Sequence, residues 1–333
     1  MPLCASAPVW CGCEGDLFRN GVEAVLKRIF GIVSVLLLAV MLLAGCGGSQ
    51  AKSSASAAAG TEVTIKMLDV GQGDAILIRT PEQTVLIDTS DSDEQAKFRE
   101  ALKKEGVTVI DKLIITHPHR DHLGGAALLF KEFTVKAVYD NGQPTTQKFY
   151  RDYLKQIKAK NIAYKALRDG DVLDFGGGVS FHVLSPTEAM VQDGGRTKDG
   201  KINLNLNSVV GRLTYGEFSM LFTGDAEVDT EKGILQRHSK DELKSLVLKS
   251  PHHGSKTSSS PAYLKAVQPK VALISCGTGN EYHHPHPSTR KKYEKDHIDF
   301  YRTDRNGTIT IRTDGKSYTV TPERGDKNDD TGN

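Results

Sequence analysis

Residues 113–125 read LIITHPHRDHLGG, and this stretch decides the fold. It opens with a short, fully apolar run, Leu113 to Ile115, which indicates a buried strand. Three histidines and one aspartate follow at once, and two glycines then allow a helix to pack closely against the sheet. Such a density of imidazole and carboxylate groups at a strand end indicates a metal site rather than a surface loop rich in histidine.

The histidines and the aspartate of this stretch divide into two pairs. His117 and His119 stand two residues apart in an extended segment, so their side chains share one side and can hold one ion. Asp121 and His122 begin the following turn, where they can hold a second ion. We therefore predict a site for two divalent metal ions, and its mixture of nitrogen and oxygen ligands suits Zn or Mn.

A later strand also ends in a residue that binds metals. The sequence LFTGD at 221–225 places Asp225 directly after an apolar run. A carboxylate can bridge two ions, because each of its oxygens can take one metal. The alternative is that Asp225 caps the helix that follows it, since aspartate is a good N-cap. In the presence of the first motif, we favour Asp225 as a metal ligand.

Histidines follow two further segments. LVLKSPHHGS at 246–255 is a strand ending in His252 and His253, and one of these should complete the second metal. We expect His253 to be the ligand and His252 to face the substrate. His284, in NEYHHP at 280–285, could be a ligand, a proton donor or part of a polar loop.

The rest of the chain alternates between strand and helix patterns. A zone from about 162 to 223 reads as strands only, and helices alternate with strands from there to about 301. The dipeptides at 306–307 and 314–315 are Asn-Gly and Asp-Gly, which favour tight turns between closing strands. We predict an α/β fold, an αββα sandwich, as one domain over 61–322. The other expected strands are 63–68, 75–78, 85–87, 113–115 and 134–139, and the expected helices are 93–105 (N-cap Ser92), 123–131 and 147–160.

The N-terminal part has the pattern of an export signal. Two basic residues precede the apolar run 29–43, and LAGC at 43–46 resembles the bacterial lipobox, in which the cysteine is lipidated. The run is short for a membrane span, which needs about 20 residues, although a single membrane anchor is the alternative. We expect a signal peptide at 1–45, lipidation at Cys46, a Gly/Ser/Ala tether over 46–60 and a polar tail at 323–333.

Composition limits the remaining possibilities. The chain has 333 residues and a formal net charge of +2, so it lacks the strongly basic balance of many nucleic-acid-binding proteins. Cys276 is the sole cysteine after Cys46, so the domain has no internal disulfide. Its stability must therefore come from the core and the metals.

The pattern His-x-His-x-Asp-His at 117–122 resembles the signature of the metallo-β-lactamase fold. This resemblance implies that the first two histidines hold metal one, and that Asp121 and His122 hold metal two. It also implies that Asp225 bridges both ions. All four positions of the signature match.

Several segments further resemble the hydrolase domain of the competence protein ComEC. They are DVGQGDA at 69–75, PHHGS at 251–255, NEYHHP at 280–285 and the region YRTD at 301–304. The resemblance covers about residues 62–322. A plain hairpin turn is the alternative for 69–75, whereas the resemblance makes Asp74 a candidate to support the ligands or contact substrate.

Two departures from the wider fold stand out. In many members a histidine from a middle loop completes metal one, but here the corresponding place resembles the Asn-x-Asn-Ser pattern within NLNLNS at 203–208. Because asparagine is a weak ligand, we expect metal one to be held loosely or by water, and Asn207 to support the ligands or contact substrate. DTS at 88–90 replaces the usual Asp-Thr-Gly, and Asp88 should orient a histidine ligand.

These residues predict an exported, lipid-anchored hydrolase. Two adjacent cations lower the pKa of a shared water, so a hydroxide bridging the ions is the expected nucleophile. We expect catalytic roles for Asp121, His252 and His284, with Ser255 contacting phosphate. The resemblance to ComEC favours a phosphodiesterase or nuclease acting on DNA or another phosphate ester. The alternatives are hydrolysis of another ester or a lactam, and a non-catalytic surface lipoprotein that binds a ligand.

Overall fold

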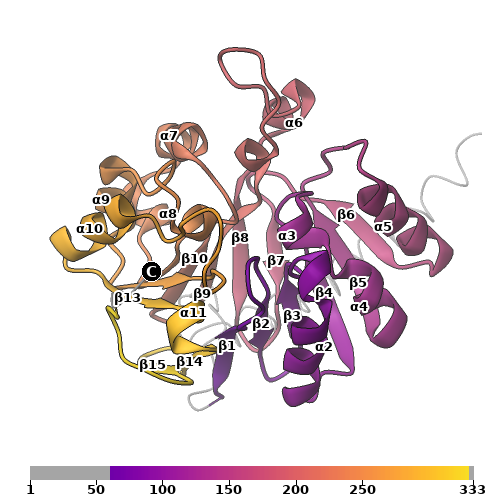
Figure 1. The fold of residues 1–333 in the computed structure, drawn as a ribbon, viewed down its shortest axis with the longest axis horizontal. Helices are drawn as coiled ribbons and strands as arrows, with labels where there is room; N and C mark the ends of the chain where they lie inside the picture. Colours follow the sequence, from indigo (N-terminus) through magenta and orange to yellow (C-terminus); the bar gives the residue numbers. More distant parts are fainter. Residues whose placement is uncertain (1–60, 330–333) are drawn as a thin grey trace, which may run out of the picture. The chain divides into compact units, whose positions relative to one another are not determined.

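Two β-sheets packed face to face form the centre of the described chain, and helices cover the outer face of each (Figure 1). The computed structural model describes residues 61–329. The predicted signal peptide, Cys46 and the whole tether therefore lie outside the described residues. Four layers in the order helix, sheet, sheet, helix confirm the predicted αββα sandwich and its α/β class.

The first sheet is mixed and contains eight strands. Strands β3, β4, β5 and β6 run parallel to one another, and the remaining neighbours are antiparallel. In spatial order the strands are β15 (Tyr318–Pro322), β14 (Ile309–Thr313), β1 (Val63–Met67), β2 (Ile76–Arg79), β3 (Thr84–Ile87), β4 (Val109–Ile114), β5 (Thr134–Asp140) and β6 (Ala163–Ala166).

The second sheet contains seven strands, with a parallel half from β10 to β13 and an antiparallel half from β7 to β10. In spatial order they are β13 (Asp299–Arg302), β12 (Val271–Ile274), β11 (Val247–Lys249), β10 (Phe218–Phe222), β9 (Val210–Tyr215), β8 (Ser180–Ser185) and β7 (Val172–Asp174).

The helices divide between the two outer faces. Those on the first sheet bury a cluster that includes Phe98, Leu129 and Tyr153, and those on the second bury Ile234, Leu264 and Tyr293. The first group is α2 (Gln95–Lys104), α3 (Arg120–Leu123), α4 (Ala126–Glu132) and α5 (Lys148–Ala159). The second is α7 (Val228–Arg237), α8 (Lys240–Leu243), α9 (Pro261–Val267) and α10 (Pro287–Lys295).

A third apolar cluster fills the space between the sheets. β1 buries alternate residues, which leaves Ile65 facing this inner core, whereas all five residues of β10 are buried. Burial of both faces explains why the central strands read as continuous apolar runs. The sheets are therefore clamped together, and the loops at their ends are free to carry polar groups.

The zone from 162 to 223 was expected to contain strands only, and that expectation is wrong. It also contains α6 (Glu188–Asp193) and the 3-10 helix η2 (Leu204–Asn207). The Thr187 hydroxyl accepts a hydrogen bond from the Met190 N–H and so caps α6. This helix and the hairpin loop after it project beyond the ends of the strands (Figure 1).

Two smaller expectations also change, and a third is confirmed. Asp91, not Ser92, caps the first turn, the 3-10 helix η1 (Ser92–Glu94), through its own carboxylate. The Asn-Gly at 306–307 ends a short helix, α11 (Thr303–Asn306), between strands of different sheets, and so makes no hairpin. The Asp-Gly at 314–315 does join the antiparallel pair β14 and β15.

The predicted polar tail is partly attached to the domain. Phe300 and Asn328 exchange hydrogen bonds, with N–H to oxygen distances of 2.7 and 2.8 Å. The Asn306 side chain also donates to the carbonyls of Arg324 and Asp326. The ordered fold therefore extends past residue 322. Among the described helices, none combines the length and apolar composition that crossing a membrane requires.

Candidate metal centre

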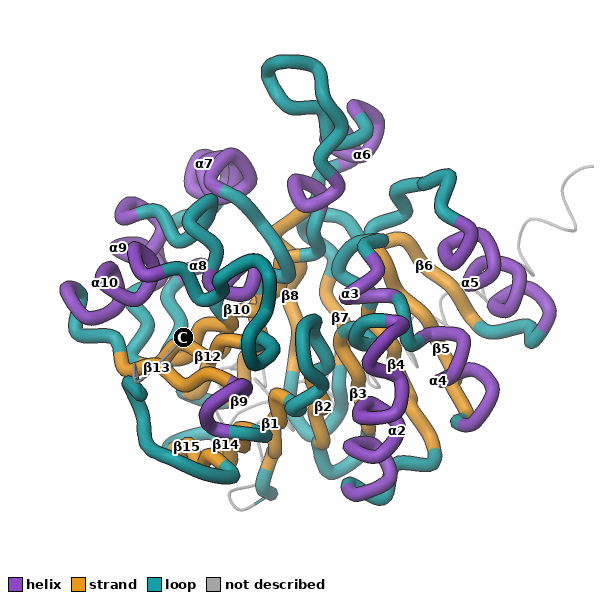
Figure 2. The backbone as a smooth tube through the Cα atoms, viewed as in Figure 1, coloured by secondary structure: helices purple, strands orange, loops and turns teal. Residues whose placement is uncertain are grey.

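Most of the predicted site residues lie at one end of the two sheets, in loops and in two short helices, α3 and the 3-10 helix η3 (Pro251–Gly254). Figure 2 distinguishes the loops, in teal, from the helices, in purple. The carboxyl ends of parallel neighbours meet at the same edge of a sheet, and most of these residues follow such strands. Asp88 follows β3, the His-x-His-x-Asp-His segment follows β4, Asp225 follows β10, and His252 and His253 follow β11.

Gly124 and Gly125 allow the His-x-His-x-Asp-His segment to pack against the loop after β3. A β-carbon on Gly124 would lie 2.2 Å from the Ser92 nitrogen, and one on Gly125 would lie 2.1 Å from the Thr89 oxygen. Only residues without a side chain permit this approach. The two loops are thereby held together, and Asp88 comes within reach of the histidines.

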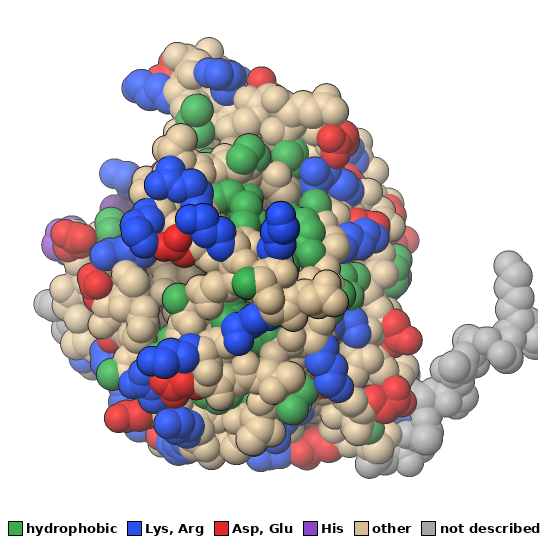
Figure 3. Space-filling model, turned by 90° about the vertical axis from the view of Figure 1, so that its right-hand side faces the viewer, with side chains coloured by type: hydrophobic (Ala, Val, Ile, Leu, Met, Phe, Trp, Pro, Cys, Tyr) green, Lys and Arg blue, Asp and Glu red, His purple; other side chains and the backbone are tan. Residues whose placement is uncertain are grey.

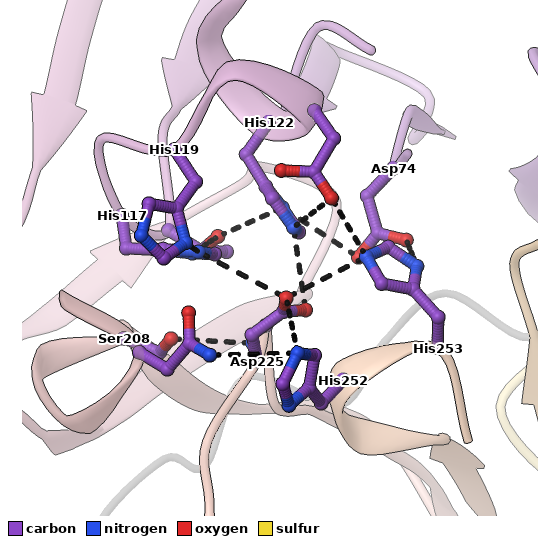
Figure 4. Close-up of polar contacts among 12 residues, drawn as sticks. Asp74, His117, His119, His122, Ser208, Asp225, His252 and His253 are labelled. Atoms are coloured by element: carbon purple, nitrogen blue, oxygen red, sulfur yellow. Dashed lines mark hydrogen bonds and ion pairs between the residues drawn. The ribbon is translucent and has the colours of Figure 1, made fainter. Parts of the chain in front are cut away.

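Four side chains form the tightest cluster of potential metal ligands. Asp121, His122, Asp225 and His253 each offer one atom, and these atoms all lie within 4.8 Å of one another. His122 Nε2 is 3.2 Å from Asp225 Oδ1, and His253 Nε2 is 3.2 Å from Asp121 Oδ2 (Figure 4). These four residues match the set expected for metal two.

Neighbouring groups hold both imidazoles of this cluster in one orientation. His122 Nδ1 lies 2.8 Å from Asp88 Oδ2, and His253 Nδ1 donates to the Ser275 carbonyl at 2.9 Å. Each Nε2 therefore points into the cluster, the arrangement usual for histidines that bind metals. His122 Nε2, His253 Nε2 and Asp225 Oδ1 are buried without a hydrogen-bond partner, so these atoms fit a cation.

A second group of donors lies on the other side of Asp225. His117 Nε2 is 2.9 Å from His119 Nδ1 and 3.9 Å from Asp225 Oδ2. The Thr116 hydroxyl lies 3.1 Å from His117 Nδ1 and donates to Asp88 at 2.8 Å. His117, His119 and Asp225 are the residues expected at metal one, and Asp225 belongs to both groups.

Asp74 supports the cluster from the loop between β1 and β2. Asp74 Oδ2 forms an ion pair with Lys249 Nζ at 2.8 Å, and both side chains are buried. Asp74 Oδ1 is also 3.5 Å from His253 Nδ1. The segment 69–75 is thus more than a hairpin turn. Lys249 was not foreseen, although a lysine inside the apolar run LVLK signals a buried partner.

Burial and the charges in the cluster shift the pKa values of the histidines in opposite directions. Burial disfavours protonation of His122, but Asp225, Asp121 and Asp88 outweigh it and raise its pKa well above the usual range. The same balance raises the pKa of His253 to about 10. Burial and then the charge on His122 lower the pKa of His117. Without metal, two imidazolium charges therefore stand among the carboxylates.

A cavity of about 340 Å³ opens onto these groups. His252 and His284 line it, with ring centroids 5.6 Å apart, and the exposed Tyr282 ring stacks on His284 at 5.7 Å. Other lining residues that sequence reasoning missed are Gln72, Asp91, Arg120 and Asn205.

His252 and His253 point to different sides because of their backbone. Both residues have φ of 52°, in the left-handed region that side chains with a β-carbon rarely adopt. His253 enters the metal cluster, whereas His252 Nε2 is 3.7 Å from Asp225 Oδ2 and its Nδ1 faces Glu227 and Thr257. The geometry agrees with the assignment of His253 as the ligand and His252 as the substrate-side group.

Two predicted residues do not reach the cavity. The Asn207 amide donates to Gln143 Oε1 at 2.7 Å and to the Met190 carbonyl at 3.0 Å, which turns it away from the histidines. Ser255 is buried, and its hydroxyl contacts the Thr257 hydroxyl at 3.0 Å. Ser255 therefore supports His252 through Thr257 and does not face a substrate.

The fold and this cluster define a class. The chain matches the Metallo-beta-lactamase superfamily over residues 68–278 and belongs to it. With its cluster of histidines and aspartates, it is a metal-dependent hydrolase of that superfamily.

Known relatives of the chain make its place within this superfamily more specific. The chain is 32% identical to "ComE operon protein 3" of Bacillus subtilis over 76% of its length, and 31% identical to "Competence protein ComA" of Neisseria gonorrhoeae over 90%. It spans only 33% and 40% of those relatives. These matches confirm the resemblance to a ComEC-like hydrolase domain.

A solved structure shares the fold. The diiron β-hydroxylase CmlA from Streptomyces venezuelae matches with a TM-score of 0.50 and 14% sequence identity. The match covers 76% of this chain and 55% of CmlA. At this identity, the likeness shows the fold alone.

Loading chelator-stripped protein with metal should release protons. His253 has a pKa of about 10 without metal, and the pKa of His122 is also raised, so both carry protons at pH 7.5 that a metal must displace. We expect release of about two protons and an apparent affinity that rises with pH between about 6.5 and 9. Calorimetric titration in buffers of different ionisation enthalpy measures both. A binding enthalpy independent of the buffer would contradict this electrostatic account.

Proposed function

We propose that this protein is a two-metal phosphodiesterase that cleaves DNA. The observation that carries the proposal is the division of donors around Asp225. His117 and His119 stand on one side, and Asp121, His122 and His253 stand on the other. Two bound cations would supply an activated water and neutralise charge on a phosphoryl group. Zn and Mn are both compatible with these nitrogen and oxygen donors.

The residues around the cluster have separate tasks in this proposal. Asp88, the Ser275 carbonyl and the Asp74–Lys249 pair fix the ligand side chains before substrate arrives. His252 lines the cavity and has a carboxylate, Glu227, behind it, so it is placed to give a proton to the leaving oxygen.

His284 has a different role from the one expected for a proton donor. Burial, followed by the charges on His253 and His252, lowers its pKa to about 3. At neutral pH the ring is therefore uncharged, and we propose that it orients substrate by hydrogen bonding and packing. It is not among the four side chains whose donor atoms cluster, and its ring stacks on that of His253, with 6.2 Å between the ring centroids.

The shape beside the site supports a long substrate. His119 lines the cavity and also a second groove of about 590 Å³, which runs between the loop 143–146 and the segments around α6. The groove leads toward the start of α5. A small ester or a lactam would fit the cavity alone, whereas a polymer chain could occupy both.

A basic surface lies along α5 and β6. Figure 3 shows Lys and Arg side chains gathered on the face that carries these elements. Asp152 is the one acidic residue of α5, and two lysines of the helix pair with it. Such a surface suits a phosphate backbone. Its exposed cations are Lys148, Arg151, Lys155, Lys158, Lys160 and Lys165.

The relatives agree with this substrate class. Two of them carry the words "competence" or "recombination" in their names, and these words concern DNA. We therefore favour DNA over a cell-wall ester or a lactam. The retained cluster also argues against a binding lipoprotein without catalysis, because such a protein has no need for it.

Hydrolysis should depend on metal and on Asp121. Chelator-stripped protein supplied with Mn or Zn should cleave bis-p-nitrophenyl phosphate and DNA, and Asp121→Ala should reduce the rate by about a hundredfold or more, because it removes a ligand. Single-stranded and duplex DNA should be compared in the same assay. Absence of cleavage despite measured metal binding would move the proposal to lactams or non-phosphate esters.

Charge reversal on α5 should separate DNA from a small ester. We expect the double variant Lys155→Glu, Lys158→Glu to weaken DNA binding by roughly tenfold and reduce its salt dependence, because two backbone contacts are lost. Turnover of bis-p-nitrophenyl phosphate should stay unchanged. The matched control is Lys291→Glu, Lys295→Glu on α10, which is exposed and on the other sheet. Equal effects of both variants on DNA would show that the α5 surface has no special role.

We also propose that the protein is exported and anchored to the membrane by lipid at Cys46. The support is the sequence 27–46, with its basic start, apolar run and Leu-Ala-Gly-Cys end. In a bacterial host, Cys46→Ser should move the protein from the membrane fraction to unprocessed or soluble forms, and labelled palmitate should no longer be incorporated. Labelling that persists in the variant would refute lipidation at this residue.

A further inference from the structure

The donors on the His117 side of Asp225 form an incomplete set. The sequence has no histidine between His182 and His238, where a middle-loop ligand was expected. The segment 203–208 occupies that place, and its side chains divide into those that face the cavity and those that do not. The 3-10 helix η2 in this segment turns its side chains in different directions, so only some of them can reach the donors around Asp225.

Asn205 is the member of η2 that faces the site. Its side chain is 6% exposed, and it lines the cavity together with His119 and Asp225. Asn207 also has a buried amide oxygen without a partner, but it lines a different cavity, with Met190 and Thr230. The two asparagines are therefore not equivalent.

Hydrogen bonds fix which end of the Asn205 amide points inward. Its Nδ2 donates to Glu227 Oε1 at 3.1 Å and lies 3.4 Å from His252 Nε2. Only the nitrogen can donate to a carboxylate, so the oxygen must occupy the other end. Asn205 Oδ1 is buried and has no hydrogen-bond partner. A buried amide oxygen without a donor needs a partner, and a cation is a suitable one.

The surroundings hold this amide in place. Glu227 also accepts a hydrogen bond from Asn203 Nδ2 at 3.0 Å, so one carboxylate fixes two asparagines. Asn203 Oδ1 accepts from the Asn205 N–H at 3.0 Å and caps η2. The Ser208 hydroxyl accepts from the Asp225 N–H at 3.2 Å, which ties the same segment to the shared aspartate (Figure 4).

We propose that Asn205 Oδ1 completes metal one, together with His117, His119 and Asp225. This assignment rests on the proposed two-metal site and names a ligand within it. An amide oxygen is neutral and hard, so it binds Zn less strongly than an imidazole and suits Mn. Metal one is consequently the weaker and more exchangeable position, and Mn is its preferred occupant. Glu227 acts as a positioning residue, through Asn205.

Metal binding tests this assignment without reference to catalysis. The purified full-length protein is stripped with chelator and titrated with Mn, while electron paramagnetic resonance reports free and bound ion. We expect two sites in the wild type. In Asn205→Ala the weaker site should lose affinity by at least about tenfold, and the tighter site should be unchanged.

Two further variants make the result specific. Asn205→Asp keeps the oxygen and adds a charge, so it should tighten Mn binding at the weaker site. Asn207→Ala is the matched control, because it removes the same amide group from η2 at a residue that lines a different cavity. This control should bind both ions within about threefold of the wild type, a change much smaller than that from loss of a ligand.

The outcomes separate the possible errors. Two undiminished Mn sites in Asn205→Ala would overturn the role of Asn205. If Asn205→Ala does not fold, Asn205→Asp provides the test. Unchanged Mn affinity at the weaker site of Asn205→Asp would overturn the proposal. A wild type with a single site would refute the two-metal site itself. Normal metal binding without DNA cleavage would refute only the proposed activity and leave the ligand assignment intact.

Discussion

Four carboxylates gather at one end of the two sheets, three of them buried and one partly exposed, and the rest of the site depends on neutralising them. Asp74, Asp88 and Asp225 are almost fully buried, and Asp121 lies beside them. Burying an unpaired carboxylate is very unfavourable, so each needs a cation or several donors. Lys249 neutralises Asp74 in an ion pair. Asp88 accepts hydrogen bonds from the Thr116 N–H and hydroxyl and contacts the His122 ring. The carboxylates of Asp121 and Asp225 face only imidazole rings in the cluster, so they are the ones suited to bind a metal cation.

This constraint explains the architecture around the site. Two sheets fixed by a shared apolar core present the carboxyl ends of parallel strands in the same region, so residues far apart in sequence can be held within a few ångströms. Gly124 and Gly125 then allow the metal-binding segment to lie directly against the loop after β3. A less rigid framework would let the carboxylates separate and become solvated, and the site would lose its affinity for cations.

The two sides of Asp225 are chemically different. One side has two imidazoles, two carboxylates and fixed hydrogen bonds behind each ring, which suits a tightly held ion. The other side has two imidazoles whose low pKa values disfavour protonation, and Asn205 of η2 lines the cavity beside them. Such asymmetry fits the proposed two-metal site, in which the first side would hold its ion tightly and the second would exchange its ion more readily. The cavity and groove meet at His119, on this second side.

The amino-acid sequence was sufficient to predict the αββα fold, the His-x-His-x-Asp-His segment and its partners Asp225 and His253, because each of these motifs directly follows an apolar strand. The sequence analysis missed α6, since the predicted strand zone has weak periodicity there. It also singled out Asn207 as a supporting or substrate residue, whereas Asn205 lines the cavity. It also did not reveal the Asp74–Lys249 pair or the role of Glu227. Those features were decided only by the tertiary structure. These features depend on contacts between segments far apart in the chain, and spacing along the sequence does not encode such contacts. They are the side-chain directions in the 3-10 helix η2, the left-handed backbone at His252 and His253, and the ion pair between Asp74 and Lys249 of the two sheets.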